Sequence, residues 1–346
     1  MGSTAYLVLE NGKVFQGEYF GVEGEVTAEV VFSTNMTGYL EAFTSRNYYG
    51  QMLVQTFPLI GNYGVISEDF ESDIVCPSAY IVKDWCQAPS NFRSEGDLDT
   101  FFKRRKVIGL CGIDTRALTK TLRTDGTMNG IITKEPDKVD FEKLKAFKIR
   151  GAMEESSCTE SYIIKNENAK YKAVLIDYGL RKSLCKMLAD GGAEVVVCPW
   201  GTKALDIAGL NADCIVLSDG PGNPADYIEA QNNLKEIIKL GLPIFAQGMG
   251  HELLAIANGF KTEKLKYGHR GANQPVKNTK TGKLYVTGQN HAYAVISDSI
   301  NPGTASELFI NVNDKSCEGI EYKNIPAVSL QFDIESLRLE NGKWIY

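Results

Sequence analysis

Residues 243–254 have the pattern of a strand, a sharp turn and a helix, which is how many enzymes hold a catalytic nucleophile. Pro243 to Ala246 is apolar and predicts a buried strand, Gly248 marks the turn, and the apolar run ending at Leu254 predicts a helix. Such an elbow lifts a Cys, Ser or Thr side chain into a cleft. Glycine has no side chain and can attack nothing. The sequence therefore predicts the scaffold of an active centre without its attacking group.

Two further loops are expected beside this elbow. Asp177–Gly179 and Ser218–Pro224 each follow an apolar strand, and open parallel sheets bind ligands beyond the carboxyl ends of their strands. Gly220 and Gly222 provide the second loop with backbone N–H groups that suit an oxyanion or a carboxylate. Taken alone, a Gly-Pro-Gly loop is a weak signal, because many connections use these residues for turn geometry.

The second part of the chain, residues 172–346, alternates strand and helix patterns. The predicted strands are Ala173–Ile176, Glu194–Cys198, Cys214–Leu217 and Pro243–Ala246, and the predicted helices are Arg181–Leu188, Ala204–Leu210 and Tyr227–Leu240. This order is typical of an α/β domain with a central, mostly parallel sheet covered by helices on both faces. The last quarter of the chain is rich in strand patterns.

Residues 1–140 predict a separate, β-rich α/β domain. Strand patterns lie at Ala5–Leu9, Val14–Tyr19 and Thr27–Ser33, and short helical patterns at Asp97–Lys103 and Asp114–Arg123. This part contains no histidine and no constellation of catalytic residue types, so we interpret it as a packing or partner-binding domain. Residues 141–171 are charged and polar, and predict a linker between the two domains.

Composition excludes several classes of function. The chain has 346 residues, which favours two domains, and its net charge of −6 gives no basic surface for nucleic acid or acidic membranes. No apolar run approaches the roughly 20 residues that span a bilayer, and no secretory signal precedes the first strand pattern. The eight cysteines include no Cys-x-x-Cys pair, so neither a disulfide nor a zinc framework is expected. We expect a cytoplasmic protein.

Short stretches spread along the chain match the motifs of one known family. They are Met36–Tyr39, Gly61–Gly64, Ser90–Arg93 and Gly112–Arg116 in the first half, and Ser218–Pro224, Gly250-His251, Gly268-His269 and Gln289–His291 in the second. From about residue 5 to residue 335 the chain resembles the small subunit of carbamoyl phosphate synthetase, whose second domain is a class I glutamine amidotransferase. Because the N-terminal domain is peculiar to this subunit, the resemblance is specific beyond amidotransferases in general.

The resemblance implies a Cys-His-Glu triad that hydrolyses glutamine. In the family, the released ammonia passes to a large subunit, which uses ATP and bicarbonate to make carbamoyl phosphate for arginine and pyrimidine synthesis. The implied partner is therefore this large subunit. The implied ligand is glutamine or a related amino acid, and no cofactor is expected.

The family's catalytic positions are mostly replaced in this sequence. By the resemblance, the triad cysteine falls on Gly248, the histidine on Asp333 and the glutamate on Glu335. The family's substrate contacts fall on Asn35, Gly220, Gly222, Met249, Glu252, Asn290, Ala292 and Tyr293. Losing the nucleophile or the base typically costs about 10⁶-fold in rate. Asp333 also adds a carboxylate near Glu335, and such like charges raise a carboxyl pKa.

Three functions fit these residues. The favoured one is a small-subunit homologue without glutaminase activity, acting as a structural or regulatory subunit in an ammonia-dependent complex. The second is an active glutamine-dependent amidotransferase subunit with altered chemistry. The third is a stand-alone module that binds an amino acid at the Gly220/Gly222 loop and Asn290.

A metal is not expected. Asp333, Glu335 and Glu252 with His251 could form a hard-metal site, but we favour carboxylates that line a wetter cleft. His269 and His291 are interpreted as structural or cleft-lining histidines.

Overall fold

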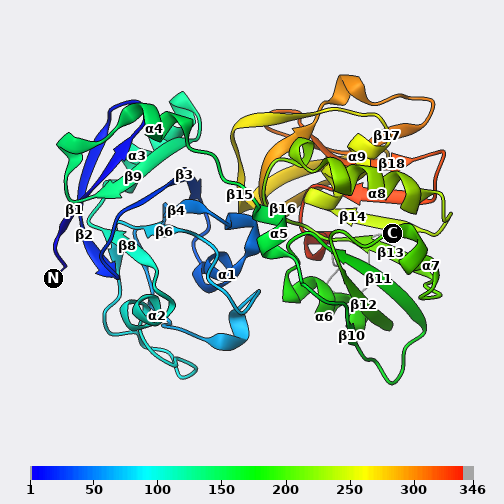
Figure 1. Ribbon diagram of the computed structural model, residues 1–346, viewed down its shortest axis with the longest axis horizontal. Coiled ribbons are helices and arrows are strands. Elements are labelled where there is room, and N and C mark those ends of the chain that lie inside the picture. Colours follow the sequence, from blue (N-terminus) through cyan, green and yellow to red (C-terminus); the bar gives the residue numbers. More distant parts are fainter. Residues whose placement is uncertain (1, 338–346) are drawn as a thin grey trace. The chain divides into compact units, whose positions relative to one another are not determined.

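The computed structural model describes residues 2–337 and divides the chain into two compact units, Met1–Ala152 and Met153–Tyr346 (Figure 1). Each unit has its own sheet and its own buried core. Within the described residues, none of the helices combines the length and apolar character that crossing a bilayer requires.

The N-terminal unit is built around a closed β-barrel with the strand order β1-β2-β8-β6-β4-β3-β9. The barrel strands are β1 (Thr4–Leu9), β2 (Val14–Gly21), β3 (Val26–Ser33), β4 (Gln51–Gln55), β6 (Ala79–Ile81), β8 (Ile108–Cys111) and β9 (Met128–Thr133). A small parallel pair, β5 (Leu59–Ile60) with β7 (Asp84–Trp85), lies apart from the barrel sheet, and the helices are α1 (Tyr39–Thr44), α2 (Leu98–Arg105), α3 (Thr115–Asp125) and α4 (Phe141–Ala146). This arrangement confirms the predicted β-rich α/β character of the first domain.

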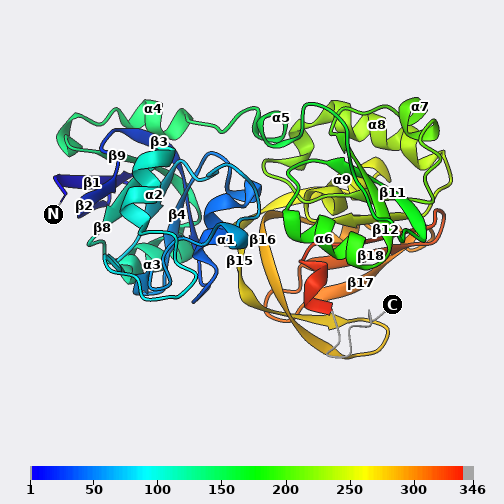
Figure 2. The same cartoon turned by 90° about the horizontal axis from the view of Figure 1, so that it is seen from below.

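The C-terminal unit contains one sheet with the order β10-β12-β11-β13-β14-β19-β18-β16-β15-β17. Its strands are β10 (Tyr162–Ile164), β11 (Tyr171–Asp177), β12 (Ala193–Pro199), β13 (Cys214–Leu217), β14 (Ile244–Gln247), β15 (Thr262–Asn278), β16 (Leu284–Val295), β17 (Ala305–Asn311), β18 (Cys317–Tyr322) and β19 (Ala327–Leu330). The stretch β12-β11-β13-β14-β19 is parallel, and the remaining pairings are antiparallel. Figure 2 shows the long strands β15 and β16 running side by side. The predicted central, mostly parallel sheet is confirmed.

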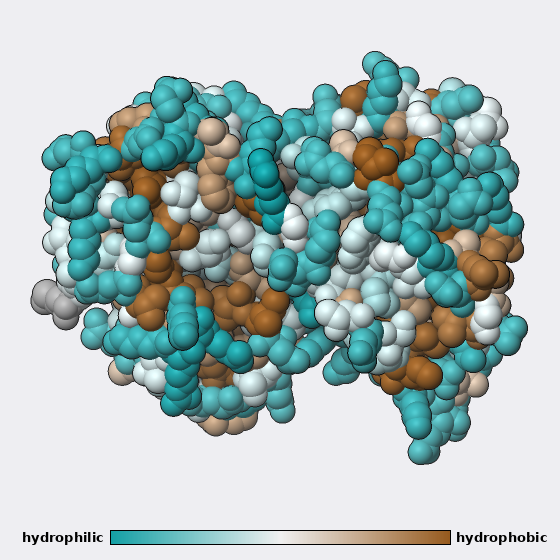
Figure 3. Space-filling view, viewed as in Figure 1, coloured by the Kyte–Doolittle hydropathy of each residue, from teal (hydrophilic) through white to brown (hydrophobic). Residues whose placement is uncertain are grey.

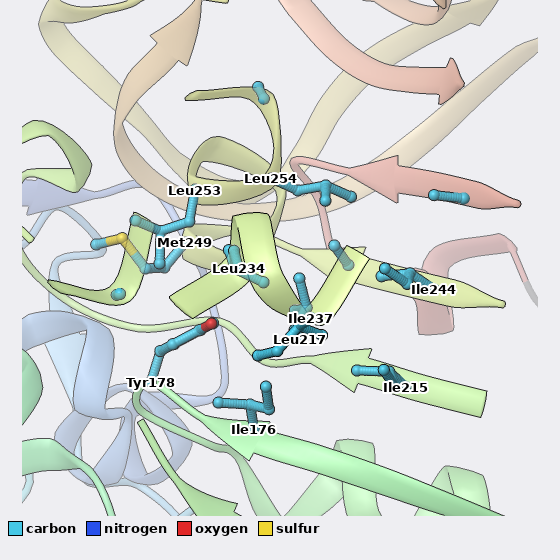
Figure 4. Packing of buried hydrophobic residues seen from close by; sticks show 14 of the residues in the cluster. Ile176, Tyr178, Ile215, Leu217, Leu234, Ile237, Ile244, Met249, Leu253 and Leu254 are labelled. Carbon is cyan, nitrogen blue, oxygen red and sulfur yellow. The ribbon is translucent and has the colours of Figure 1, made fainter. Parts of the chain in front are cut away.

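Helices cover both faces of the parallel strands. Successive strand residues point to opposite faces of the sheet, so apolar side chains on each face need a covering layer. The helices are α5 (Ala152–Ser156), α6 (Lys182–Asp190), α7 (Ala204–Ala208), α8 (Ile228–Ile238) and α9 (Met249–Ala257). Val174 and Ile176 of β11 belong to the core beneath α7, α8 and α9, whereas Ala173 and Leu175 belong to the core on the α6 side. Figure 4 shows the first of these cores, with Leu234 of α8 near the strand residues.

The stretch 141–171 is more ordered than the predicted linker. It contains α4, α5 and β10, and the division between the two units falls at Ala152/Met153. Residues 162–164 pair antiparallel with β12, which gives the outer edge of β12 partners for its backbone N–H and C=O groups. The sheet of the C-terminal unit therefore begins before residue 172.

The molecular surface is mostly hydrophilic in the view of Figure 3, with hydrophobic residues gathered in the middle of the visible face of the N-terminal unit. Exposed apolar side chains of that unit include Met36 and Phe92. The apolar region visible in Figure 3 is of the kind at which partner proteins commonly bind.

Candidate active site

The strand, turn and helix predicted around Gly248 are present. Gly248 separates β14 from α9 and has φ 52° and ψ −115°. Residues other than glycine adopt this backbone conformation only with strain. Its N–H donates to the Leu330 carbonyl of β19 at 2.9 Å, and the Gly250 N–H donates to the Ser218 carbonyl at 3.0 Å. Because both neighbouring strands hold the turn, the elbow is a fixed part of the sheet edge.

A carboxylate of the chain itself occupies the space where a nucleophile would stand. A Cβ atom added to Gly248 would lie 1.9 Å from Oδ1 of Asp219, well inside contact distance. The same Oδ1 accepts hydrogen bonds from the N–H groups of Gly220, at 2.8 Å, and Met249, at 3.2 Å. These are N–H groups at the loop and at the helix start, of the kind that suit a bound anion. The anion-binding donors of this elbow are therefore already used.

Sequence reasoning missed Asp219. An aspartate between two small residues in a turn is ordinary, and nothing in its local pattern shows where the carboxylate points. The side chain of Met249, a predicted substrate contact, is also buried in the core, so its backbone N–H is the part that reaches the elbow.

Asp333, at the position of the family's histidine, is held by an arginine. Arg181 Nη2 lies 2.7 Å from Asp333 Oδ1 and 3.7 Å from Glu335 Oε2. Gln247, the last residue of β14, adds a weaker contact from Nε2 to Asp333 Oδ1 at 3.5 Å and accepts the Ile334 N–H on its Oε1 at 3.2 Å. The chain thus brings Asp333 and Glu335 to the end of β14, as the resemblance implied.

The expected repulsion between Asp333 and Glu335 is offset. Arg181, which sequence analysis had noted only as the start of a helix, supplies the opposite charge to both carboxylates. A charge-assisted hydrogen bond of this kind is stronger than a neutral one. The Asp333 carboxylate is therefore already engaged by the arginine side chain.

Glu252 lies in the first turn of α9 and is 3% exposed. Burial raises the pKa of Glu252 well above its ordinary value, and the neighbouring carboxylates of Asp219 and Glu318 raise it further. The side chain is therefore expected to stay protonated at neutral pH. Its shape and hydrogen-bonding capacity then resemble those of the glutamine that the family resemblance implies at this position.

Replacing Glu252→Gln is expected to stabilise the protein at pH 8 more than at pH 5. Because the pKa of Glu252 is raised in the folded state, the folded protein keeps a proton that the unfolded chain loses. The free energy of unfolding therefore falls as the pH rises above the pKa of Glu252 in the unfolded chain. Glutamine removes this loss, and we expect a gain of about 1–3 kcal/mol at pH 8. Urea unfolding at both pH values measures the difference. Glu263→Gln, at an exposed position, is the control and should change stability by less than about 0.5 kcal/mol. If Glu252→Gln were no more stable than the wild type at pH 8, Glu252 would not be protonated in the folded protein as expected.

The other predicted substrate residues of the C-terminal unit lie in the loop after β13 and on β16. Gly222 has φ 101° in the loop after β13, and a Cβ there would meet the Tyr227 hydroxyl at 2.5 Å. Asn290, Ala292 and Tyr293 lie on β16, a strand that contacts α9. Contact of any of these residues with a ligand stays a prediction.

Asn35 belongs to the N-terminal unit, beyond the end of β3. Its N–H donates to Ser33 Oγ at 3.3 Å, and its carbonyl accepts a hydrogen bond from the Gln55 side-chain amide. These contacts order its backbone, and its role in binding a substrate also stays a prediction.

The histidine beside the elbow is not a base. His251 is fully buried, its Nδ1 lies 2.7 Å from Ser329 Oγ, and burial lowers its pKa to about 3. Within residues 2–337, Asp333, Glu335, Glu252 and His251 do not come together as a set of metal ligands. Arginine holds the first two, and Glu252 is expected to be protonated.

The C-terminal unit, with its parallel sheet and the strand–Gly248–helix elbow, matches the family model described as "Glutamine amidotransferase class-I" over residues 174–345. The model described as "Carbamoyl-phosphate synthase small chain, CPSase domain" matches residues 7–132. The two matches together cover both units.

Relatives that match nearly the whole chain are named after the same small chain as the second family model. Proteins called carbamoyl phosphate synthase small chain are 43% identical in Clostridium perfringens, over 96% of this chain and 94% of theirs, and 41% identical in Syntrophotalea carbinolica, over 96% and 93%. The one from Lactococcus lactis is 39% identical over 95% and 92%. The chain belongs to the carbamoyl phosphate synthase small chain family.

Proposed function

We propose that this protein is a small chain without glutaminase activity, which serves as a structural or regulatory subunit of a complex that makes carbamoyl phosphate from ammonia. The observation that carries the proposal is the elbow. Its nucleophile position is Gly248, and the space above it is filled by the Asp219 carboxylate on the Gly220 and Met249 N–H groups. An attack on the glutamine amide has neither an attacking atom nor free N–H groups for the oxyanion.

Four of the five cysteines of the C-terminal unit are poor substitutes for the missing nucleophile. Burial raises the pKa of Cys185 to about 12 and also raises the pKa values of Cys198, Cys214 and Cys317. Thiols of this kind stay protonated and inert. This argues against the alternative of an amidotransferase that uses relocated chemistry.

A stand-alone amino-acid-binding module is supported less well. Its binding loop would have to offer N–H groups to a ligand carboxylate, whereas the Gly220 N–H already donates to Asp219. The proposed partner is the large chain of carbamoyl phosphate synthase, and the apolar surface of the N-terminal unit is compatible with a bound protein.

The test is co-expression of a tagged form of this chain with a carbamoyl phosphate synthase large chain. We expect the two chains to co-purify, and the complex to form carbamoyl phosphate from ammonium chloride but not from glutamine. A loss of about 10⁶-fold in glutamine hydrolysis places that reaction below detection. A family member with cysteine at the elbow, in the same large-chain complex, is the control and should use both nitrogen donors. Failure to co-purify would reject the subunit role, and glutamine-dependent product would reject the loss of activity.

A further inference from the structure

We propose that His269, His291 and Glu318 form a buried site for one divalent transition-metal ion of the zinc type. The three residues lie on adjacent strands β15, β16 and β18, and His269 and His291 are register partners across β15 and β16. Their ligand atoms all lie within 4.8 Å of one another, and all three side chains are buried. The site is independent of the elbow chemistry and of the proposed function.

The orientation of the Gln289 amide is determined by its neighbours. Its Nε2 donates to Thr287 Oγ1 at 3.1 Å and to Glu318 Oε2 at 3.0 Å. Thr287 gives its own hydroxyl hydrogen to the Gln274 carbonyl at 2.9 Å, so it can only accept from the amide. The amide oxygen of Gln289 therefore faces His291 Nε2, at 3.2 Å.

This leaves His291 between oxygen atoms on both sides. Its Nδ1 lies 2.7 Å from the Tyr293 carbonyl, which accepts the one N–H of a neutral imidazole. The lone pair on Nε2 then faces the oxygen of Gln289 and, at 3.8 Å, Oε2 of Glu318. The Nε2 lone pair of His291 thus faces two oxygen atoms with no hydrogen between them, which is an arrangement that a bound cation satisfies. The Glu318 oxygens also accept hydrogen bonds, from Gln289 Nε2 at 3.0 Å, Ser316 Oγ at 3.0 Å and Asn311 Nδ2 at 3.4 Å.

His269 is oriented in the same way. Its Nε2 lies 2.8 Å from Asp314 Oδ2, and its Nδ1 lies 3.2 Å from Glu318 Oε1. An N–H donated from Nε2 to Asp314 leaves the lone pair of Nδ1 toward Glu318, with the side-chain amide of Asn311 also 3.5 Å from Nδ1. Metal-binding histidines usually donate their second ring N–H to a carboxylate or a carbonyl, and here Asp314 and the Tyr293 carbonyl provide both.

The spacing suits a small tetrahedral ion. Zinc bonds of about 2.0–2.1 Å place neighbouring ligand atoms about 3.3 Å apart. The separations are 3.2 Å from His269 Nδ1 to Glu318 Oε1, 3.8 Å from His291 Nε2 to the other oxygen of Glu318, and 3.2 Å from His291 Nε2 to Gln289 Oε1. The ligand atoms of the three residues lie within 4.8 Å of one another, so the side chains would have to move closer together around a zinc ion. Gln289 Oε1 thus stands where a fourth ligand would be.

Charge and ligand type narrow the choice of ion. One divalent ion balances the carboxylates of Glu318 and Asp314, and Glu318 is fully buried. Two imidazoles and one carboxylate favour zinc over magnesium or calcium, which prefer oxygen ligands in larger numbers. The competing arrangement is a hydrogen-bonded network in which protons take the place of the ion.

Metal binding to the full-length chain tests the proposal directly. Protein freed of metal with a chelator and dialysed is titrated with Zn²⁺ by calorimetry, and with Co²⁺ while the visible spectrum is recorded. We expect one ion per chain, a Co²⁺ spectrum typical of tetrahedral nitrogen and oxygen ligands, and a higher unfolding temperature in the presence of Zn²⁺.

Variants locate the ion. Asp314→Asn, at a half-exposed positioning residue, should fold normally and bind Zn²⁺ about 10–100-fold more weakly. His269→Gln should abolish binding, and Asp333→Asn, at the elbow, is the matched control and should bind as the wild type does. Absence of stoichiometric binding to the wild type would overturn the proposal. Binding of Zn²⁺ to Asp314→Asn with the wild-type affinity would also overturn the proposal. This second test holds even if variants of the metal-binding residues, such as His269→Gln, fail to fold.

Discussion

Gly248→Cys alone will leave glutamine hydrolysis undetectable, whereas the combination Asp219→Ala, Gly248→Cys and Asp333→His will make it measurable. In the single variant the new side chain meets the Asp219 carboxylate, and no base stands at position 333. Removing the Asp219 carboxylate frees the Gly220 and Met249 N–H groups as oxyanion donors. Histidine at position 333 restores a base beside Glu335, and the absence of that base typically costs up to about 10⁶-fold in rate.

The measurement is glutamate release from glutamine at saturating substrate. Asp219→Ala with Gly248→Cys but without the histidine should be slower than the combination by up to about 10⁶-fold. The same combination carrying Gly248→Ala in place of the cysteine is the control for thiol-independent hydrolysis and should be inactive. Labelling of the introduced cysteine with a thiol reagent reports whether it is accessible. Activity in Gly248→Cys alone would show that Asp219 does not obstruct the elbow.

The parallel half of the C-terminal sheet could be predicted from the sequence because its strands are buried on both faces. Continuous apolar runs such as Cys214–Leu217 are bounded by turns, and the observed β13 has the same limits. The elbow also had a local signature, since β14, Gly248 and α9 are consecutive. These features depend on neighbours in the sequence.

β10 and the contacts at the site depend on residues far apart in the chain. β10 has three residues within a polar stretch and becomes a strand by pairing with β12. The Asp219 carboxylate reaches the N–H of Met249 30 residues later, and Arg181 reaches Asp333 152 residues later. No period or motif in the sequence encodes such distances, so the residues that fill the site were found only from the structure.

The resemblance and the structure contribute different parts of the argument about activity. The resemblance identified Gly248 and Asp333 as replaced positions, but a vacant elbow could in principle still hold a ligand. Asp219 changes that expectation, because its carboxylate takes both the space and the N–H donors that an anionic group would use. Gln247 and Arg181 likewise contact Asp333, so this residue belongs to a connected group of polar side chains.

Gly248→Ala is expected to destabilise the protein by about 2–6 kcal/mol. Part of the cost is backbone strain at φ 52°, about 1–3 kcal/mol, and part is the overlap of the new Cβ with Asp219 Oδ1, of similar size. Urea unfolding of the purified variant measures the total. Gly241→Ala is the reference for a glycine with positive φ, because Gly241 has φ 70° and open space where its Cβ would stand.

A double-mutant cycle with Asp219→Ala isolates the overlap. Asp219→Ala removes the obstructing carboxylate, so Gly248→Ala in that background should cost about what Gly241→Ala costs. The coupling between positions 219 and 248 should then reach about 1–3 kcal/mol, whereas positions 219 and 241 should be additive within about 0.5 kcal/mol. Additive effects at 219 and 248 would mean that the carboxylate moves aside without cost. In that case Asp219 would not keep the elbow closed, and the proposed lack of glutaminase activity would rest on the missing cysteine and histidine alone.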